Sequence, residues 1–331
     1  MPLKTPPYWY RAQSSPPPFA EMALGLLARP YQWGHKINQS YQNAKKAPLP
    51  ILCVGNAVAG GSGKTPVCLA LIKIIRKHGI SKRPFILTRG YGGSIKEPMM
   101  ISTELHSHYH CGDEALMLAR SSPTIIAPKR IDAAELAALE GADLGIMDDG
   151  LQHGGIIKDI TFMVIDGQAG FGNLKTLPAG PLREPLSEAI AKTDAFILIG
   201  KDKRGVTTLL PEDKPLFTAH IEPVPASLPE KGAIVAFAGL GRPEKFYHFL
   251  QELGYEISAW HPYPDHHNYS DEDLEILTAS AKEHNATLVT TEKDYMRLLG
   301  APQAKDIKHI AINAVFSDEG ELVSFLKDRL Q

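Results

Sequence analysis

The sequence predicts an α/β protein with two lobes, in each of which helices cover a mainly parallel sheet. Short apolar, β-rich runs alternate with helical patterns along most of the 331 residues. A glycine-rich loop joins the first of these runs to a helix, and a proline-dense stretch, 210–232, separates two such series. Alternation of this kind is typical of parallel sheets, because each crossover between neighbouring strands needs a helix-length connection.

The elements follow in chain order after a separate basic and apolar segment, 1–46. The first lobe is predicted over 47–215, with helices at 67–79, 113–121 and 130–141 and strands at 51–56, 84–90, 123–128, 143–149, 160–167 and 194–200. The second lobe, with its linker, is predicted over 216–331, with helices at 243–254, 271–284 and the C-terminus and strands at 233–240, 256–263, 287–294 and 309–316.

Composition indicates an ordinary globular protein of a reducing compartment. The apolar content is 44% and the charged content is 22%. The net charge of −2 does not indicate nucleic-acid binding. The three cysteines are odd in number and scattered, unlike a disulfide framework. Because the chain shows neither an apolar run of spanning length nor a signal-peptide pattern, we expect a cytoplasmic protein. The sequence carries no indication of oligomeric state.

The glycine-rich loop gives the most specific chemical prediction. Residues 51–65 read ILCVGNAVAGGSGKT, a strand, a loop and the start of a helix. Glycines let backbone N–H groups turn towards phosphate oxygens, while Lys64 can reach the β- and γ-phosphates and Thr65 can place its hydroxyl on Mg²⁺. Val58 and Ala59 depart from the usual patterns, so the loop belongs to an uncommon subclass. An ordinary turn is the alternative, but the context favours ATP binding by Gly60, Gly61, Ser62, Gly63, Lys64 and Thr65.

Two aspartates stand at the end of the predicted strand 143–149. Ligands of α/β sheets bind at the carboxyl ends of strands, where Asp148 or Asp149 can hold Mg²⁺ or one of its waters. If the strand continued through both, one side chain would face the metal and the other a neighbouring backbone. A strand-ending turn is the alternative, because Asp-Gly is a common turn dipeptide.

Residues around Asp113 have a structural and a chemical interpretation. Asp113 precedes an apolar-periodic run and is, by itself, a natural helix N-cap. Histidines at 106, 108 and 110 alternate just before it, but no second ligand cluster at zinc-like spacing supports a metal site there. In the second lobe, His266 follows a strand in a proline-stiffened loop. A carboxylate paired to such an imidazole could accept a hydroxyl proton only when the lobes close.

Two arginines lie in loops suited to anionic ligands. Arg89 follows the strand at 84–90, and Arg183 lies in a proline-studded loop, PAGPLREP. Both could make bidentate phosphate contacts. Glycine and proline in both loops suit plain turns equally well.

The first 46 residues carry Lys4, Arg11, Arg29, Lys36, Lys45 and Lys46 against a single acid, Glu21. The segment is also rich in leucine, methionine, tyrosine and tryptophan. Such a segment could lie in a membrane interface with its cations near anionic headgroups. It could equally form a helix that packs on the protein's own core, and its irregular pattern leaves both interpretations open.

Several of these residues belong to a set of motifs that resembles a known family. VGNAVAGGSGKTP, LTRGYGG, GDEALMLA, DDGLQH, DGQAGFGN with LPAGPLREP, PDHHNY and TTEKDYMRL occur in the order seen in tetraacyldisaccharide 4′-kinases, the lipid A 4′-kinases of Gram-negative bacteria. The resemblance runs from roughly residue 8 to 300 and includes the unusual Val58 and Ala59. It is weaker at 106–110 and over the last 30 residues.

The resemblance implies a P-loop NTPase-type α/β/α domain and a smaller α/β/α domain joined by a β-ribbon linker. It implies transfer of the γ-phosphoryl group of ATP, with Mg²⁺, to the 4′-hydroxyl of tetraacyldisaccharide 1-phosphate, giving lipid IVA. It also implies peripheral attachment to the cytoplasmic face of the inner membrane through the N-terminal region. An acylated disaccharide phospholipid and an anionic membrane surface are the expected partners, and nucleic acid is not.

The resemblance also implies roles for individual residues. Asp113 would accept the hydroxyl proton, and His266 would orient Asp113 and tune its pKa, with His267 a weaker candidate for that role. Lys64 and Arg183 complete the predicted catalytic set, and Glu184 lies in the loop tied to the site. The predicted metal set is Thr65, Asp148, Asp149 and Glu114.

Two other functions are compatible with the residues alone. One is a P-loop NTPase or kinase acting on a soluble small molecule, for which loss of residues 1–46 would not change membrane association. The other is a nucleotide-dependent binding protein without turnover, for which substitution of Asp113 or His266 would have no functional effect.

Overall fold

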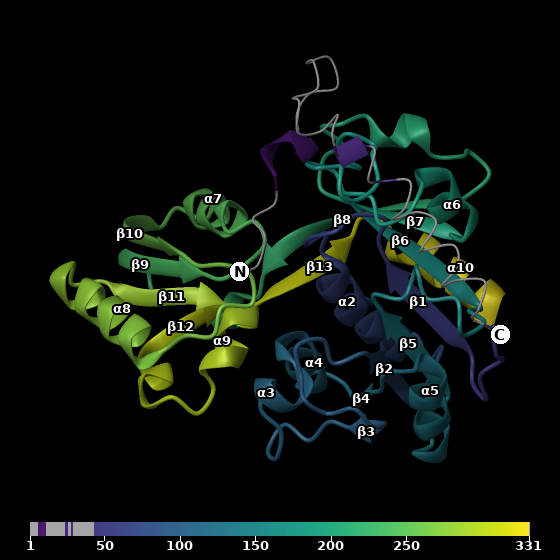
Figure 1. Ribbon diagram of the computed structural model, residues 1–331, viewed down its shortest axis with the longest axis horizontal. Coiled ribbons are helices and arrows are strands. Elements are labelled where there is room, and N and C mark those ends of the chain that lie inside the picture. The colour runs from purple at the N-terminus through teal and green to yellow at the C-terminus, as the bar shows by residue number, and fades with distance from the viewer. Residues whose placement is uncertain (1–5, 11–23, 26–27, 29–42, 331) are drawn as a thin grey trace.

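The computed structural model describes residues 6–10, 24–25, 28 and 43–330 and consists of two α/β lobes joined by a two-stranded ribbon (Figure 1). The predicted membrane-associating segment, 1–46, therefore lies largely outside the described residues. None of the described helices is long and apolar enough to cross a membrane.

The larger lobe is built on a nine-stranded sheet with the order β13-β8-β7-β6-β1-β5-β2-β4-β3. Pairing is parallel except at the two edges, where β13 and β3 run antiparallel to their neighbours. The strands are β1 (Ile51–Gly55), β2 (Pro84–Thr88), β3 (Met99–Met100), β4 (Thr124–Ile126), β5 (Leu144–Asp148), β6 (Ile160–Asp166), β7 (Ala195–Ile199), β8 (Leu216–Pro223) and β13 (Ile312–Phe316). The central strands are buried on both faces, which explains their continuous apolar runs.

Helices cover both faces of this sheet. The residues of α2 (Lys64–Lys77), α4 (Asp113–Ala119) and α10 (Glu319–Leu330) pack with Leu52 and Val54 on one face. On the other face, α5 (Arg130–Leu139) packs with Ile51 and Cys53. On the same face, α6 (Leu186–Ala191) packs with Met163 and Phe196. Alternate residues of β1 therefore enter two different cores, as a strand's period of two requires. The short helices are η1 (Pro7–Tyr10), α3 (His108–Cys111) and η2 (Val206–Leu209).

The smaller lobe has a four-stranded parallel sheet with the order β10-β9-β11-β12. Its elements are η3 (Pro225–Ser227), β9 (Ala233–Ala238), α7 (Glu244–Glu252), β10 (Glu256–Pro262), α8 (Asp271–Glu283), β11 (Thr287–Thr291), α9 (Glu292–Leu298), η4 (Pro302–Asp306) and β12 (Ile307–Ile310). The apolar side of α7 packs on one face, and α8 and the end of α9 pack on the other.

The lobes are joined by the antiparallel pair β8 and β13, which runs between them in Figure 1. The single strand predicted at 309–316 is divided between two sheets, because β12 ends at Ile310 and β13 begins at Ile312. The proline-dense stretch, expected as a connection, contains β8. After the ribbon, Leu322 and Leu326 of α10 are buried in the core of the larger lobe, so the chain ends in the lobe where its first strand lies.

Candidate active site

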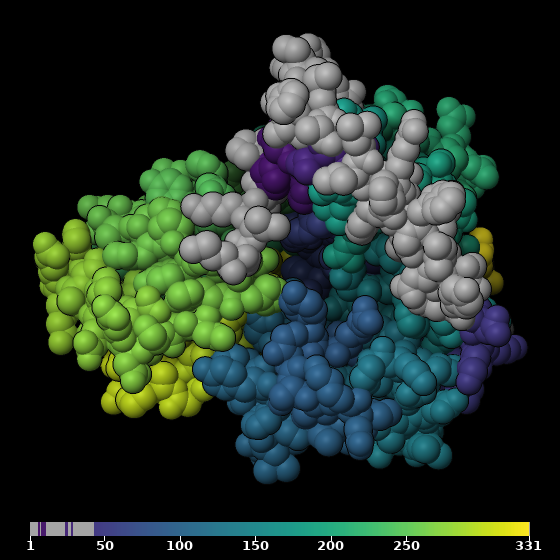
Figure 2. Space-filling model, viewed as in Figure 1, coloured from purple at the N-terminus to yellow at the C-terminus, as the bar shows by residue number. Residues whose placement is uncertain are grey.

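A cleft of about 1370 Å³ lies between the lobes at the carboxyl ends of the central strands. The glycine loop follows β1, Asp148 ends β5 and Asp166 ends β6, while His266 and Lys293 approach from the smaller lobe. Figure 2 shows the front face hollowed between the green smaller lobe and the rest of the molecule, with dark blue atoms recessed in the hollow. This is where α/β sheets bind ligands.

The glycine loop has the conformation that phosphate binding requires. Gly60 and Gly63 have positive φ angles of 110° and 85°, which residues with a Cβ rarely adopt. Lys64 Nζ donates to Asn56 Oδ1 at 3.2 Å and lies 3.6 Å from Asp149 Oδ1. The Ser62 hydroxyl is buried and has no hydrogen-bond partner among the described residues. Because an unpartnered buried hydroxyl is costly, a bound phosphate would satisfy this loop.

Asp148 is the acidic residue best suited to a metal ion. Its side chain is buried, and burial together with the charges of Glu114 and Asp149 raises the pKa of its carboxyl group to about 6. A divalent cation bound beside this carboxyl group would favour its charged form against both effects. No group of three or more histidine, cysteine, aspartate or glutamate side chains that could hold a metal occurs in the described part of the chain. Mg²⁺ takes few protein ligands and keeps waters and substrate phosphates.

The other two acids of the predicted metal set, Asp149 and Glu114, are engaged by cations. The strand ends at Asp148, and Asp149 has a left-handed φ of 50°. Its carboxylate accepts from Arg183 Nη1 at 2.8 and 3.0 Å. Because the strand does not continue through both aspartates, the alternation expected for a continued strand does not apply. Glu114 Oε1 accepts from Lys293 Nζ at 3.0 Å. The residues that fit Mg²⁺ most directly are therefore Asp148 and Thr65.

We expect Mg²⁺-dependent activity to decline below about pH 6 because of Asp148. Below its pKa of about 6 the carboxyl group is protonated and cannot hold a cation. The apparent Mg²⁺ affinity should fall by about tenfold for each further pH unit. Titrating activity with Mg²⁺ between pH 5 and pH 8 tests this, and saturating Mg²⁺ should move the acid limb to lower pH. An acid limb that is independent of Mg²⁺ would contradict it.

The same shift sets the effect of Asp148 on stability. Its folded pKa of about 6 lies above the ordinary value of 3.8. The stability that this group contributes is therefore complete below pH 3.8 and is lost as the pH rises through about 6. The difference corresponds to at most about 3 kcal/mol. In the metal-free protein at pH 8, Asp148→Asn should accordingly raise Tm.

The most buried polar contact between the lobes is centred on Asp113. The helix N-cap is Gly112 rather than Asp113, whose Oδ1 accepts from the backbone N–H of Glu114 at 2.8 Å. Its Oδ2 faces the smaller lobe, where His266 Nδ1 lies at 3.0 Å and Arg297 Nε donates at 2.7 Å. Arg297 Nη2 is 2.6 Å from the same oxygen, within ion-pair distance, although its hydrogens point elsewhere. The structure thus brings together the two residues predicted as a catalytic pair.

Asp113 is held as a carboxylate in this arrangement. Burial alone would raise the pKa of the carboxyl group, but the His266 hydrogen bond and the charges of Lys293 and Arg297 outweigh burial and lower it. The other predicted histidine, His267, instead pairs with Asp273 Oδ2 at 2.9 Å within the smaller lobe.

Arg297 and Lys293 are residues that the sequence analysis did not single out. Arg297 Nη1 also donates to Asp294 Oδ1 at 2.8 Å, so its guanidinium is fixed on both sides. Lys293 Nζ lies 3.5 Å from His266 Nε2 and 3.7 Å from Asp265. Both lie in the motif TTEKDYMRL, in which charged residues follow the end of a strand. That position was the signal in the sequence that could have identified them as site residues.

The loop after Arg183 is tied to the site by Gln152. Gln152 Nε2 donates to the Asn56 carbonyl at 3.0 Å and to Glu184 Oε1 at 3.2 Å, and its Oε1 accepts from Arg183 at 3.3 Å. Glu184 is buried and also pairs with Lys192. Glu184 therefore supports the loop, while Arg183 reaches Asp149.

A positive corner adjoins the aspartates. Burial and the charges of Arg130, Lys158 and Arg89 lower the pKa of His153 to about 4. Arg130 donates Nη2 to the Asp148 carbonyl at 2.8 Å, while its buried Nε and Nη1 find no partner in the described ranges. An anionic group bound here would satisfy these donors.

Two of the histidines at 106–110 make local hydrogen bonds to the backbone. His106 Nδ1 accepts from the Ser102 N–H at 3.1 Å, and His110 Nδ1 accepts from the Ser107 N–H at 3.0 Å. His108 is buried against Tyr109, with ring centroids 3.9 Å apart. Nothing in this arrangement supports a metal site.

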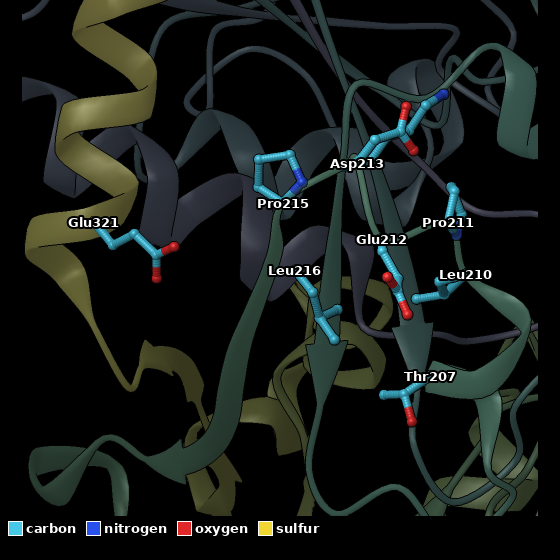
Figure 3. A pocket seen from close by; sticks show the side chains of 9 residues that line it. Thr207, Leu210, Pro211, Glu212, Asp213, Pro215, Leu216 and Glu321 are labelled. Atoms are coloured by element: carbon cyan, nitrogen blue, oxygen red, sulfur yellow. The ribbon is translucent and has the colours of Figure 1, made fainter.

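A second hollow, of about 500 Å³, lies between the segment that leads into β8 and the helix α10 (Figure 3). It is lined by residues 207 and 210–216 and by Glu321, and Glu212, Asp213 and Glu321 make it acidic. None of the predicted site residues lines it. The candidate active site is therefore the cleft between the lobes.

These features define a P-loop phosphotransferase: a phosphate loop after β1, a buried aspartate at the end of the neighbouring strand β5, and a carboxylate–imidazole pair across the cleft. The chain belongs to a particular family of these enzymes, because the model of the family Tetraacyldisaccharide-1-P 4′-kinase matches residues 22–331. This confirms the family, the enzyme class and the fold that the motifs predict.

Curated relatives agree along nearly the whole chain. The tetraacyldisaccharide 4′-kinase of Paramagnetospirillum magneticum is 41% identical over 89% of this chain and 90% of that one. The enzyme of Bradyrhizobium diazoefficiens is 37% identical over 99% and 97%. A crystal structure of the "apo" form of LpxK from Aquifex aeolicus in complex with ATP has a TM-score of 0.75 and 26% identity, covering 94% of this chain and 99% of that chain.

Proposed function

We propose that this chain transfers the γ-phosphoryl group of ATP to the 4′-hydroxyl of a tetraacyldisaccharide 1-phosphate in lipid A biosynthesis. The family supports the activity. The observation that carries the residue roles is the Asp113–His266 pair, at 3.0 Å, in the cleft that also contains the glycine loop. We further propose that the larger lobe is the nucleotide-binding unit and the smaller lobe the closing unit. The predicted unit 216–331 also contains β8, β13 and α10, which belong to the larger lobe.

The proposed reaction is a single displacement at phosphorus. A bond forms between the sugar oxygen and the γ-phosphorus as the bond to the bridging oxygen breaks, and ADP leaves. The hydroxyl proton passes to Asp113, oriented by His266. Although its lowered pKa makes Asp113 a weak base, a loose transition state releases the proton late, when the attacking oxygen has become acidic.

Positioned charges provide the rest of the catalysis. Lys64 and the loop N–H groups would bind the phosphates, and Arg183 would hold Asp149 in place. Mg²⁺, when bound by Thr65 and Asp148, would supply neutralising charge to the phosphate oxygens. In this proposal, Asp149 and Glu114 shape the field around the ion.

We propose that the protein works peripherally at the cytoplasmic face of the inner membrane, where an acylated substrate resides, and that it has no nucleic-acid partner. The first described residues rest on the larger lobe, because Trp9 Nε1 donates to the Pro178 carbonyl at 3.3 Å and the Asn173 N–H donates to the Trp9 carbonyl at 2.8 Å. Lys45 and Lys46 are exposed at the other end of the segment. Their charges are available to anionic headgroups.

Reversing two of these charges tests the membrane proposal without removing the Trp9 contacts. Lys45→Glu with Lys46→Glu should weaken binding to vesicles containing phosphatidylglycerol by about 30-fold or more, since each cation contributes about 1 kcal/mol. Cosedimentation measures the affinity. The control is Lys282→Glu with Lys305→Glu, which reverses two exposed lysines of the smaller lobe. Equal losses in both double variants would contradict a specific role for the segment.

The activity itself is tested with γ-labelled ATP, Mg²⁺, detergent and tetraacyldisaccharide 1-phosphate, followed by thin-layer chromatography. Label in a lipid with a new 4′-phosphate is the expected result. Labelled inorganic phosphate, or a labelled soluble acceptor, with no labelled lipid would instead favour a P-loop NTPase or a kinase acting on a soluble molecule.

A further inference from the structure

A second ionic contact joins the lobes on the other side of the glycine loop. Asp166 ends β6, next to the strand that leads into the loop. Its Oδ2 accepts from Arg242 Nη2 at 2.7 Å and from Lys245 Nζ, both from the smaller lobe. Arg242 Nη2 also donates to the carbonyl of Gly61, within the loop, at 3.0 Å. The smaller lobe thus places a guanidinium directly on the phosphate loop.

The cluster has more positive than negative charge. Two cations share one carboxylate oxygen, while Asp166 Oδ1 accepts, within the described residues, a single backbone N–H, from Gln168 at 3.0 Å. Burial alone would raise the pKa of Asp166, but Lys245 and Arg242 outweigh burial and lower it. Arg242 and Lys245 can therefore bind a second anion. Both side chains line the cleft.

Arg242 is held in place from a further side. Its guanidinium carbon lies 5.2 Å from the centre of the Tyr10 ring, and the Tyr10 carbonyl accepts from Arg204 Nη2 at 2.7 Å. A stacked guanidinium keeps its planar face fixed and its edge free for oxygen ligands. The residue is thus oriented towards the loop without a ligand.

We propose that Arg242 and Lys245 are the phosphate-binding cations of the smaller lobe, which the polyphosphate of ATP takes over from Asp166. A terminal phosphate offers more charge and more acceptor oxygens than one carboxylate, so the cations gain by the exchange. Arg242 then neutralises charge on the transferring group. This rests on the proposed use of ATP and adds two residues to the nucleotide site.

The proposal also links nucleotide binding to the Asp113–His266 pair across the cleft. Arg242 and Lys245 belong to the same lobe as His266 and Arg297. Cations that bind the terminal phosphate hold that lobe against the loop, and with it the imidazole beside Asp113. ATP would thus favour the closed arrangement more than ADP does.

The decisive measurement compares two nucleotides. Isothermal titration calorimetry with Mg²⁺ gives the Kd of a non-hydrolysable ATP analogue and of ADP for the wild type, Arg242→Ala, Lys245→Ala and Lys282→Ala, an exposed lysine of the same lobe. Arg242→Ala should weaken the ATP analogue by about 10- to 100-fold and ADP by about twofold or less. Lys282→Ala should change neither.

Equal weakening of both nucleotides, or of neither, would overturn the proposal, because a merely structural contact does not distinguish them. Arg242→Lys, which keeps the charge, should restore part of the preference and guards against misfolding of the alanine variant. Absence of ATP binding by the wild type would instead refute the proposed function.

Asp166→Asn gives a test of opposite sign. If Asp166 holds the cations in place of a phosphate, removing its charge should tighten binding of the ATP analogue, by about threefold or more. Weaker binding would mean that Asp166 only anchors the cations, and this would overturn its role as a stand-in for the phosphate. In steady state, Arg242→Ala should lower kcat by about 10²-fold or more with a smaller change in the KM for ATP.

Discussion

Replacing Asp113 by asparagine should lower kcat by about 10³-fold while leaving the Kd for ATP within about threefold of its normal value. The amide keeps the shape of the carboxylate but cannot accept the hydroxyl proton. Asp113 faces His266 and Arg297 and makes no contact with the glycine loop in the described structure. Nucleotide binding should therefore persist.

Asp113→Asn tests the proton acceptor most directly, because it keeps the shape of the side chain, whereas Asp113→Ala removes the side chain altogether. Asp113→Ala should abolish turnover as well, but it removes the partner of a buried guanidinium, and breaking such a pair costs about 3–5 kcal/mol. The transfer assay and ATP titration calorimetry, both on protein whose Tm has been checked, separate chemistry from folding. If ATP binding disappears together with turnover in Asp113→Asn, Asp113 has only a structural role.

Removal of the Lys64 charge should lower kcat by about 10²- to 10³-fold. The ammonium is already positioned by Asn56 and Asp149, so it needs little reorganisation to stabilise negative charge on the phosphates. Lys64→Met is the preferred variant, because it keeps the length of the side chain and removes only the charge. The measurement is initial rate against ATP concentration at saturating lipid.

The matched control is Lys77→Ala, at the far end of the same helix, where the side chain is 65% exposed and pairs with Glu319. That variant should keep full activity. Near-normal activity in Lys64→Met would exclude the phosphate-loop interpretation, whatever happens to stability.

The local part of the site could be predicted because its chemistry lies within single short stretches of the chain. The residues 60–65 are contiguous, and their glycines, lysine and threonine match one known use of a strand–loop–helix. Asp148 was recognisable because an apolar run ended at an acidic residue. In both cases the strand positions the residue, and the strand is visible as an apolar run.

The contacts across the cleft could not be predicted from spacing. Arg297 lies 184 residues from Asp113, and Arg242 lies 76 residues from Asp166. From the residues alone, each of these arginines is compatible with a solvent-exposed charge. The motif resemblance pointed to Asp113 and His266 together. It contained Lys293 and Arg297 only as members of TTEKDYMRL, without a role, and none of its motifs contained Arg242. The turn at Asp149 towards Arg183 was likewise missed, because it depends on a left-handed backbone at one residue.

The α/β class, the phosphate loop and the family follow from the sequence, since apolar periodicity and contiguous motifs are local properties of a chain. Which lobe receives the chain's end, which carboxylates meet cations and which arginines reach the cleft depend on the folded structure. The reason is that β8 and β13, which are both strands of the larger sheet, carry the chain to and from the smaller lobe. Where such a ribbon places one lobe against the other depends on packing over the whole molecule.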